Sequence, residues 1–137
     1  MSDILITAGP FTLTARLEES AAPLTCAAFR KLVPLQDHLI HVRWSGQATW
    51  IPLGDLSVGV PFENATTYPA AGEILLYPGG VSETEILIPY GPTRFASKAG
   101  ELAGSHFLTV VSGREHLAAL GHLALWKGAQ PIRMELV

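Results

Sequence analysis

Hydrophobic residues recur at every second position in many short segments of this chain, and this period limits the fold more than any other feature. In the segment 11–18 Phe11, Leu13, Ala15 and Leu17 share one face, and polar residues occupy the other. The segment 132–137 alternates in the same way. Other short segments are rich in β-branched or aromatic residues, namely 4–7, 38–44, 47–53, 72–78, 84–90 and 105–111. Together they predict about eight β-strands.

Only two segments depart from this period. Residues 23–33 space their apolar side chains helically between Pro23 and Pro34, which suit a helix start and stop. Residues 114–123 also have helical spacing, although Gly121 is a poor helix former. The pattern therefore predicts a mainly β (all-β) fold, a closed antiparallel barrel of about eight strands with two helices capping its open ends.

The chain of 137 residues is expected to form a single domain, 1–137, because no linker or repeat interrupts it. No apolar run approaches the ~20 residues that span a bilayer, which argues against a membrane partner. Asp3 and the Gly9-Pro10 pair do not suit a signal peptide, so a cytoplasmic location is expected. The single cysteine, Cys26, agrees with that location.

The charge composition indicates which kinds of partner the chain can bind. A net charge of −3 and the lack of a basic stripe argue against nucleic acid. Charged residues make up 15% of the chain and hydrophobic ones 48%, against an average of about 25% charged. So little polar surface predicts a homo-oligomer.

One stretch of the sequence partly matches a known metal-binding motif. Gly72, Pro78 and Gly80 match the second motif of the metal-binding cupins, but Glu83 stands where that motif needs a histidine. The five histidines include no His-x-His pair. We therefore expect no metal and no other cofactor, and Gly79 and Gly80 are interpreted as turn residues with positive φ.

Several segments, taken in order, resemble the cyclophilin fold. They are "LTCAAFRKLV" (24–33), "IHVRWSGQATWIPLGD" (40–55), "PFENATTYPAAGEILLY" (61–77) and "HFLTVVSGREHLAAL" (106–120). More closely, the chain resembles a bacterial family of unknown function with a cyclophilin-like fold, marked by 43–46, 63–80 and 83–91. The resemblance implies a cyclophilin-like barrel and says little about activity.

The departures from active prolyl isomerases are informative. Arg43 could stand for the arginine that polarises the proline amide in those enzymes. The Phe-Met-x-Gln element is replaced by residues 49–52, so its glutamine has no counterpart. The resemblance therefore leaves only a degenerate peptidyl-prolyl isomerase as an alternative function.

Six residues are candidates for ligand binding: Arg43, Glu63, Tyr90, Arg94, Phe95 and His106. If Trp44 packs inside with Ile40 and Val42, Arg43 faces out, either as a solvated side chain or as a clamp for a carboxylate. Glu63 begins a long irregular stretch, where it is either a ligand contact or part of the turn chemistry around Asn64.

The segment 89–97 carries Tyr90, Arg94 and Phe95 on a Gly-Pro loop. Such a loop suits a lid over an anionic ligand or a contact between subunits. His106 shares an apolar strand face and is either a proton carrier or a hydrogen-bonded core residue. Glu83 and Glu85 share one strand face and favour a solvated sheet edge over paired catalytic carboxylates.

These residues suggest a protein that binds a small anionic or carbonyl-bearing metabolite in a cleft on the barrel. We expect Arg43 and Arg94 to converge on that cleft. An enzyme acting on a small amide or carboxylate is an alternative, with Arg43 as electrophile and Glu63 or His106 as proton carrier. No serine or cysteine nucleophile has a partner at a recognisable spacing, so catalytic residues stay unassigned.

Overall fold

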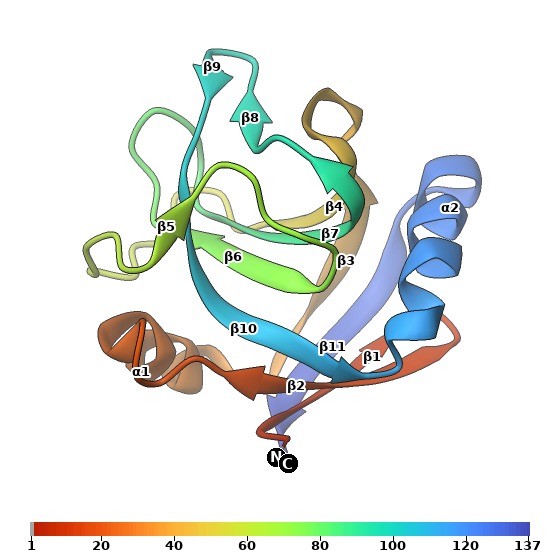
Figure 1. Cartoon of the computed structure of the whole chain (residues 1–137), viewed down its shortest axis with the longest axis horizontal. Coiled ribbons are helices and arrows are strands. Elements are labelled where there is room, and N and C mark those ends of the chain that lie inside the picture. Colours follow the sequence, from red (N-terminus) through yellow and green to blue (C-terminus); the bar gives the residue numbers. More distant parts are fainter. Residues whose placement is uncertain (1) are drawn as a thin grey trace.

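The computed structural model describes residues 2–137 and confirms a closed antiparallel β-barrel (Figure 1). Its sheet has the order β2-β1-β11-β3-β4-β7-β6-β10, and pairing of β2 with β10 closes it. The strands are β1 (Ile4–Ala8), β2 (Phe11–Leu17), β3 (Leu35–His41), β4 (Gly46–Pro52), β6 (Glu73–Tyr77), β7 (Glu85–Thr93), β10 (Gly104–Ser112) and β11 (Gln130–Leu136). Closure leaves these eight strands without a free edge.

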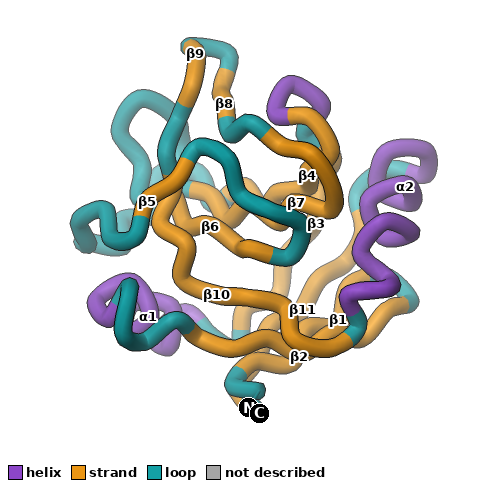
Figure 2. The backbone as a smooth tube through the Cα atoms, in the orientation of Figure 1, coloured by secondary structure: helices purple, strands orange, loops and turns teal. Residues whose placement is uncertain are grey.

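Shorter elements complete the fold (Figure 2). The two-residue strand β5 (Ala65–Thr66) pairs with β10, and β8 (Ala96–Ser97) and β9 (Gly100–Glu101) form a separate hairpin. The helices are α1 (Pro23–Leu32), the 3-10 turns η1 (Arg43–Ser45) and η2 (Arg114–His116), and α2 (Leu117–Lys127). Both expected helices are present, and α2 continues four residues beyond the expected end because Leu120 and Ala124 keep packing on the barrel.

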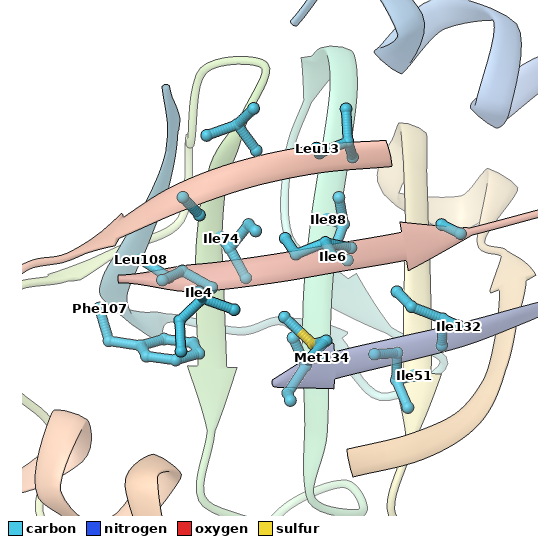
Figure 3. Packing of buried hydrophobic residues seen from close by; sticks show 14 of the residues in the cluster. Ile4, Ile6, Leu13, Ile51, Ile74, Ile88, Phe107, Leu108, Ile132 and Met134 are labelled. Carbon is cyan, nitrogen blue, oxygen red and sulfur yellow. The ribbon is translucent and has the colours of Figure 1, made fainter. Parts of the chain in front are cut away.

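The barrel interior is filled by the inward side chains of the alternating strands (Figure 3). Ile4 and Ile6 of β1 meet Leu13 of β2 and Met134 of β11 in this core, and all are fully or almost fully buried. Residues from both helices belong to the same cluster, including Phe29 of α1 and Leu120 of α2. The helices therefore close the barrel, as the sequence predicts.

Helix α1 lies against β10. The Phe29 ring packs on the Phe107 ring with centroids 4.9 Å apart, and Cys26 is fully buried beside them. Burial raises the pKa of the Cys26 thiol to about 12, so the reactive thiolate is scarce at neutral pH. Cys26 is a packing residue.

A second apolar cluster lies on the outer face of the barrel. It contains Val42, Ala48, Leu75, Tyr77, Leu87, Phe95 and Leu102, with Trp50 packed against it. Phe95 and Leu102 flank the β8–β9 hairpin, so the base of this arm packs from outside on residues of β4, β6 and β7. β6 and β7 are consequently buried on both faces, which explains their uninterrupted apolar runs.

The structure corrects the expected orientation of the segment after β3. Leu39 is fully buried in the barrel interior, whereas Ile40 is partly exposed. Val42 packs in the outer cluster, and the strand ends there because residues 43–45 form the turn η1. Trp44 is therefore half exposed at the surface and does not lie in the core.

Gly79 and Gly80 have φ angles of 95° and 130°, which confirms the expected turn after β6. Within residues 2–137, none of the helices has the length and apolar character needed to cross a membrane.

Candidate functional site

Arg43 and Arg94 border one shallow hollow on the outside of the barrel. Arg43 and Trp44 of η1 form one wall, and Pro92, Thr93 and Arg94 at the end of β7 form the other. The hollow encloses about 460 Å³ and is open to solvent. The two arginines thus come from chain segments about fifty residues apart.

Backbone contacts fix the two walls relative to one another. The Arg94 backbone N–H donates a hydrogen bond of 2.9 Å to the Ser45 carbonyl oxygen. Gly46 pairs with Thr93 in the β4–β7 ladder, and its φ of 107° allows the chain to turn there. A Cβ at position 46 would lie 2.7 Å from the Pro92 carbonyl oxygen. Only glycine lets the two walls approach this closely.

The two guanidinium groups have different surroundings. Arg94 forms an ion pair of 3.1 Å with Glu101 of β9, and both side chains are about half exposed. Such a surface pair adds only about 0–1 kcal/mol to stability. Arg43 is exposed and takes part in none of the ion pairs among residues 2–137. Arg43 is therefore the freer cation of the hollow.

His41 and Tyr90 form a hydrogen-bonded pair beside Arg43. The His41 Nε2 atom lies 2.7 Å from the Tyr90 hydroxyl, and the Tyr90 ring packs edge-on against His122 of α2. Burial, followed by the charges of Arg43 and His122, lowers the pKa of His41. Burial raises the pKa of Tyr90, although Arg43 opposes this shift. Both groups are thus uncharged at neutral pH, and the positive charge of Arg43 acts on them.

Phe95 does not border the hollow. Its side chain is 1% exposed and meets Tyr77 edge-on, with ring centroids 5.9 Å apart. It belongs to the outer apolar cluster and anchors the arm that carries β8 and β9. The structure gives Phe95 a packing role in place of the expected ligand contact.

Glu63 caps helix α1. Its carboxylate accepts hydrogen bonds from the backbone N–H groups of Leu24 and Thr25, at 3.2 and 2.7 Å, and from the Thr25 hydroxyl, at 2.7 Å. Burial favours a higher pKa, but these hydrogen bonds outweigh it and lower the pKa of Glu63. A carboxylate at a helix N-terminus satisfies free N–H groups and interacts favourably with the helix dipole.

We expect Glu63→Ala to lower the free energy of unfolding by about 1–2 kcal/mol, since Ala22 at the N-cap position makes no side-chain hydrogen bond. Glu73→Ala is a matched control, because that glutamate accepts only one backbone hydrogen bond, from Ala70. Urea unfolding of both variants measures the difference. A Glu63 variant as stable as the wild type would return this residue to the candidate ligand contacts.

His106 is held in a separate polar chain. Its Nε2 atom lies 2.7 Å from the Thr109 hydroxyl, which donates to Glu18 at 2.6 Å. Glu18 also pairs with Arg16 at 3.0 Å. Neither His106 nor Glu63 lines the hollow, so the structure does not bring them to Arg43.

Three pocket-lining residues, Trp44, Trp50 and Glu85, were not expected from the sequence as ligand contacts, and of these Trp44 alone borders the hollow. Trp44 also borders a second pocket of about 410 Å³, together with Trp50 and Glu85. The solvated sheet edge expected for Glu85 is wrong, because β7 lies inside the sheet and Glu85 is 4% exposed. The apolar run that follows Glu85 was the available signal, since it indicates a strand buried on both faces.

A larger hollow of about 530 Å³, between loops 54–57 and 78–84, has no aromatic or basic residue in its lining. It offers less to an organic ligand than the two sites around Trp44. Residues 2–137 contain no cluster of three metal-ligating side chains, and the absence of a bound metal stays a prediction.

The comparisons with known proteins agree with the fold. A family described as "Protein of unknown function (DUF3830)" matches residues 4–136, and the chain belongs to it. No curated protein sequence matches the chain.

Two solved structures are similar. McbB, solved in complex with tryptophan, has a TM-score of 0.69 and 19% identity over 96% of this chain, which spans only 44% of the McbB chain. A cyclophilin-type peptidyl-prolyl cis-trans isomerase of Cryptosporidium parvum has a TM-score of 0.60 and 15% identity over 98% of both chains. At such identities the likeness shows the cyclophilin-like fold alone, which confirms the resemblance seen in the sequence.

Proposed function

We propose that this member of the DUF3830 family binds a small molecule with a carboxylate or carbonyl group in the hollow between Arg43 and Arg94. The observation that carries the proposal is that two separate segments bring both arginines to one hollow beside the half-exposed Trp44. The whole chain has a net charge of −3, so two guanidinium groups form a local positive field.

The chemistry of the lining supports this ligand class. A guanidinium group binds a carboxylate through two parallel N–H donors, and such charged hydrogen bonds contribute about 1.5–3 kcal/mol each. The Trp44 ring offers an apolar surface for the rest of the molecule. Arg94 must exchange its exposed partner Glu101 for the ligand, which costs little.

Catalysis has less support than binding. The proton carriers considered for an enzyme, Glu63 and His106, are engaged with α1 and with Thr109. The pair next to Arg43 is His41 and Tyr90, whose shifted pKa values hold it uncharged at neutral pH. Neither His41 nor Tyr90 lines the hollow, so this pair does not face a ligand bound there.

The experiment compares benzoate with benzyl alcohol, which keeps the ring and lacks the charge. Benzoate should raise the melting temperature of the wild-type protein, with about 2.7 kcal/mol of added stability at ~100 times its dissociation constant. Arg43→Ala and Arg94→Ala should each remove that response. Their melting temperatures without ligand should stay within about 0.5–1 kcal/mol of the wild type, because both side chains are exposed.

Arg133→Ala is the matched control. It removes an exposed arginine that pairs with Glu135 at 2.7 Å outside the hollow, so the benzoate response should persist. Equal responses to benzoate and benzyl alcohol, or a full benzoate response in both hollow variants, would refute the proposal. A large loss of stability without ligand would indicate that the two arginines hold the loops together.

A further inference from the structure

A second pocket lies on the other side of Trp44, with a lining of opposite charge. It encloses about 410 Å³ and is less open than the arginine hollow. Its walls are the loop after β6, the start of β7, β4 and the β8–β9 hairpin. The lining residues that matter for its chemistry are Trp44, Trp50, Glu83, Glu85 and Lys98.

Glu85 is the unusual member of this lining. It is 4% exposed and lies in the ladder between Pro52 of β4 and Tyr77 of β6. Among residues 2–137 its carboxylate takes part in no ion pair, and no side-chain hydrogen bond reaches it. The buried side-chain atom without a hydrogen-bond partner among the described residues is His41 Nδ1, so the Glu85 carboxyl group keeps slight contact with the pocket that it lines. A mostly buried acid that opens on a pocket favours a ligand that supplies a positive charge or hydrogen-bond donors.

The electrostatics point the same way. Burial first, and then the nearby Glu83, raise the pKa of Glu85 to about 8. With this pKa, Glu85 is mostly protonated at neutral pH. A cation beside Glu85 would lower that pKa again and restore the carboxylate.

Two indole rings stand beside this carboxyl group. The Trp44 and Trp50 centroids lie 6.3 Å apart with their planes at 70°, so an edge of one ring meets the face of the other. Indole faces attract cations through the ring quadrupole, more strongly than other aromatic side chains. An acidic group next to two indoles is the combination that suits an organic ammonium ion.

Lys98, the basic residue in the pocket lining, does not pair with the pocket's acidic groups. Lys98, in the turn of the β8–β9 hairpin, is exposed, and no ion pair joins it to Glu83 or Glu85. Lys98 and Glu83 are the charged groups in the lining besides Glu85, and Tyr77 is the titratable neighbour across the ladder.

We infer that this pocket binds a small organic amine in its protonated form, with the ammonium group on the Glu85 carboxylate and the carbon body against Trp44 and Trp50. The site goes beyond the proposed function, because Trp44 is the one residue that it shares with the arginine hollow. The loop that holds Glu83 is ordered by hydrogen bonds from the backbone N–H groups of Val81 and Ser82 to the Tyr77 hydroxyl.

The test uses benzylamine, with benzyl alcohol as its uncharged counterpart. The indole N–H signals of the protein are followed by NMR at pH 7, where Trp126 on α2 serves as an internal reference because it lines neither site. Benzylamine should shift the signals of Trp44 and Trp50 and leave Trp126 unchanged. Glu85→Gln should weaken this binding by at least about tenfold, as expected for the loss of a charged hydrogen bond.

Glu115→Gln is the matched control. Glu115 is exposed and lines neither site, so its loss should leave benzylamine binding unchanged. Affinity in the wild type should also rise by up to about tenfold between pH 6 and pH 7, as Glu85 ionises, and Glu85→Gln should remove this dependence. Equal affinity in Glu85→Gln and wild type, or equally tight binding of benzyl alcohol, would overturn the inference.

The variant Lys98→Gln tests whether the Lys98 side chain, instead of an external amine, occupies the pocket. If only this variant binds benzylamine, Lys98 itself occupies the pocket in solution and the inference is wrong. The benzoate test is independent of these outcomes, since Arg43→Ala should abolish benzoate binding and retain benzylamine binding. If one of the two proposals fails, the test of the other still gives its own answer.

Discussion

Gly121→Ala should lower the free energy of unfolding by roughly 2 kcal/mol, although alanine is the better helix former by about 1 kcal/mol. A Cβ atom at position 121 would lie 2.2 Å from a carbon of the Tyr90 ring. The ring has no room to retreat, since its hydroxyl is bonded to His41 and its edge meets His122. Helix α2 must therefore move away from β7.

Denaturant unfolding of a double-mutant cycle measures this effect. The same Gly121→Ala change in a Tyr90→Ala background should cost much less, because the ring that causes the clash is gone. If Gly121→Ala instead stabilises the protein by the amount that helix propensity alone predicts, α2 does not pack on Tyr90 as described. The contact matters for the site because it positions the Tyr90 hydroxyl on His41, beside Arg43.

The second large effect is a loss of stability as pH rises, caused by Glu85. The pKa of Glu85 is about 8 in the folded protein, against the ordinary glutamate value of 4.5. Between these values the folded state holds more protons than the unfolded state, so the free energy of unfolding falls with increasing pH. The slope is at most about 1.4 kcal/mol per pH unit. The pocket's contact with solvent reduces it.

Glu85→Gln cannot ionise and should escape this loss. Its free energy of unfolding, relative to wild type, should increase by roughly 2 kcal/mol between pH 5 and pH 8. Urea titrations at several pH values in that range provide the measurement. Glu115→Gln is the control, and its difference from wild type should vary little with pH because Glu115 is exposed and lies outside the Glu85 pocket. A difference for Glu85→Gln that stays constant with pH would show that Glu85 has an ordinary pKa.

The barrel and its helices were predictable because they depend on local pattern. Alternation in 11–17 and 132–136 matches β2 and β11, and the prolines at 23 and 34 bracket α1. The turn at Gly79 and Gly80 follows from the need for positive φ. Each of these features is encoded within about ten residues of sequence.

The outer cluster was not predictable in the same way. Alternating apolar and polar residues predict a strand with one buried face and one solvent-exposed face. The outer faces of β4, β6 and β7 are instead covered by the arm that carries β8 and β9, which is distant in the sequence from β4. Phe95 therefore resembled a lid residue on a Gly-Pro loop, although it anchors that arm. Trp44 was expected inside because the strand was extended by three residues past its end at His41.

Glu63 shows the limit of local patterns for site residues. Its partners Leu24 and Thr25 are 39 and 38 residues away along the chain, so no local sequence motif predicts that Glu63 caps the helix. Arg43 and Arg94 were expected to converge because of their positions in the predicted fold. In the structure both border one hollow. The Glu101 partner of Arg94 was missed, because the β8–β9 hairpin has no sequence signature of its own.

A crystal structure of the protein with benzoate bound tests the proposed binding site most directly. The benzoate carboxylate should lie within about 3 Å of the Arg43 guanidinium nitrogens, with Arg94 turned from Glu101 toward the same group and the ring against Trp44. A benzoate bound elsewhere, with Arg43 still facing solvent and Arg94 still paired with Glu101, would contradict the proposal.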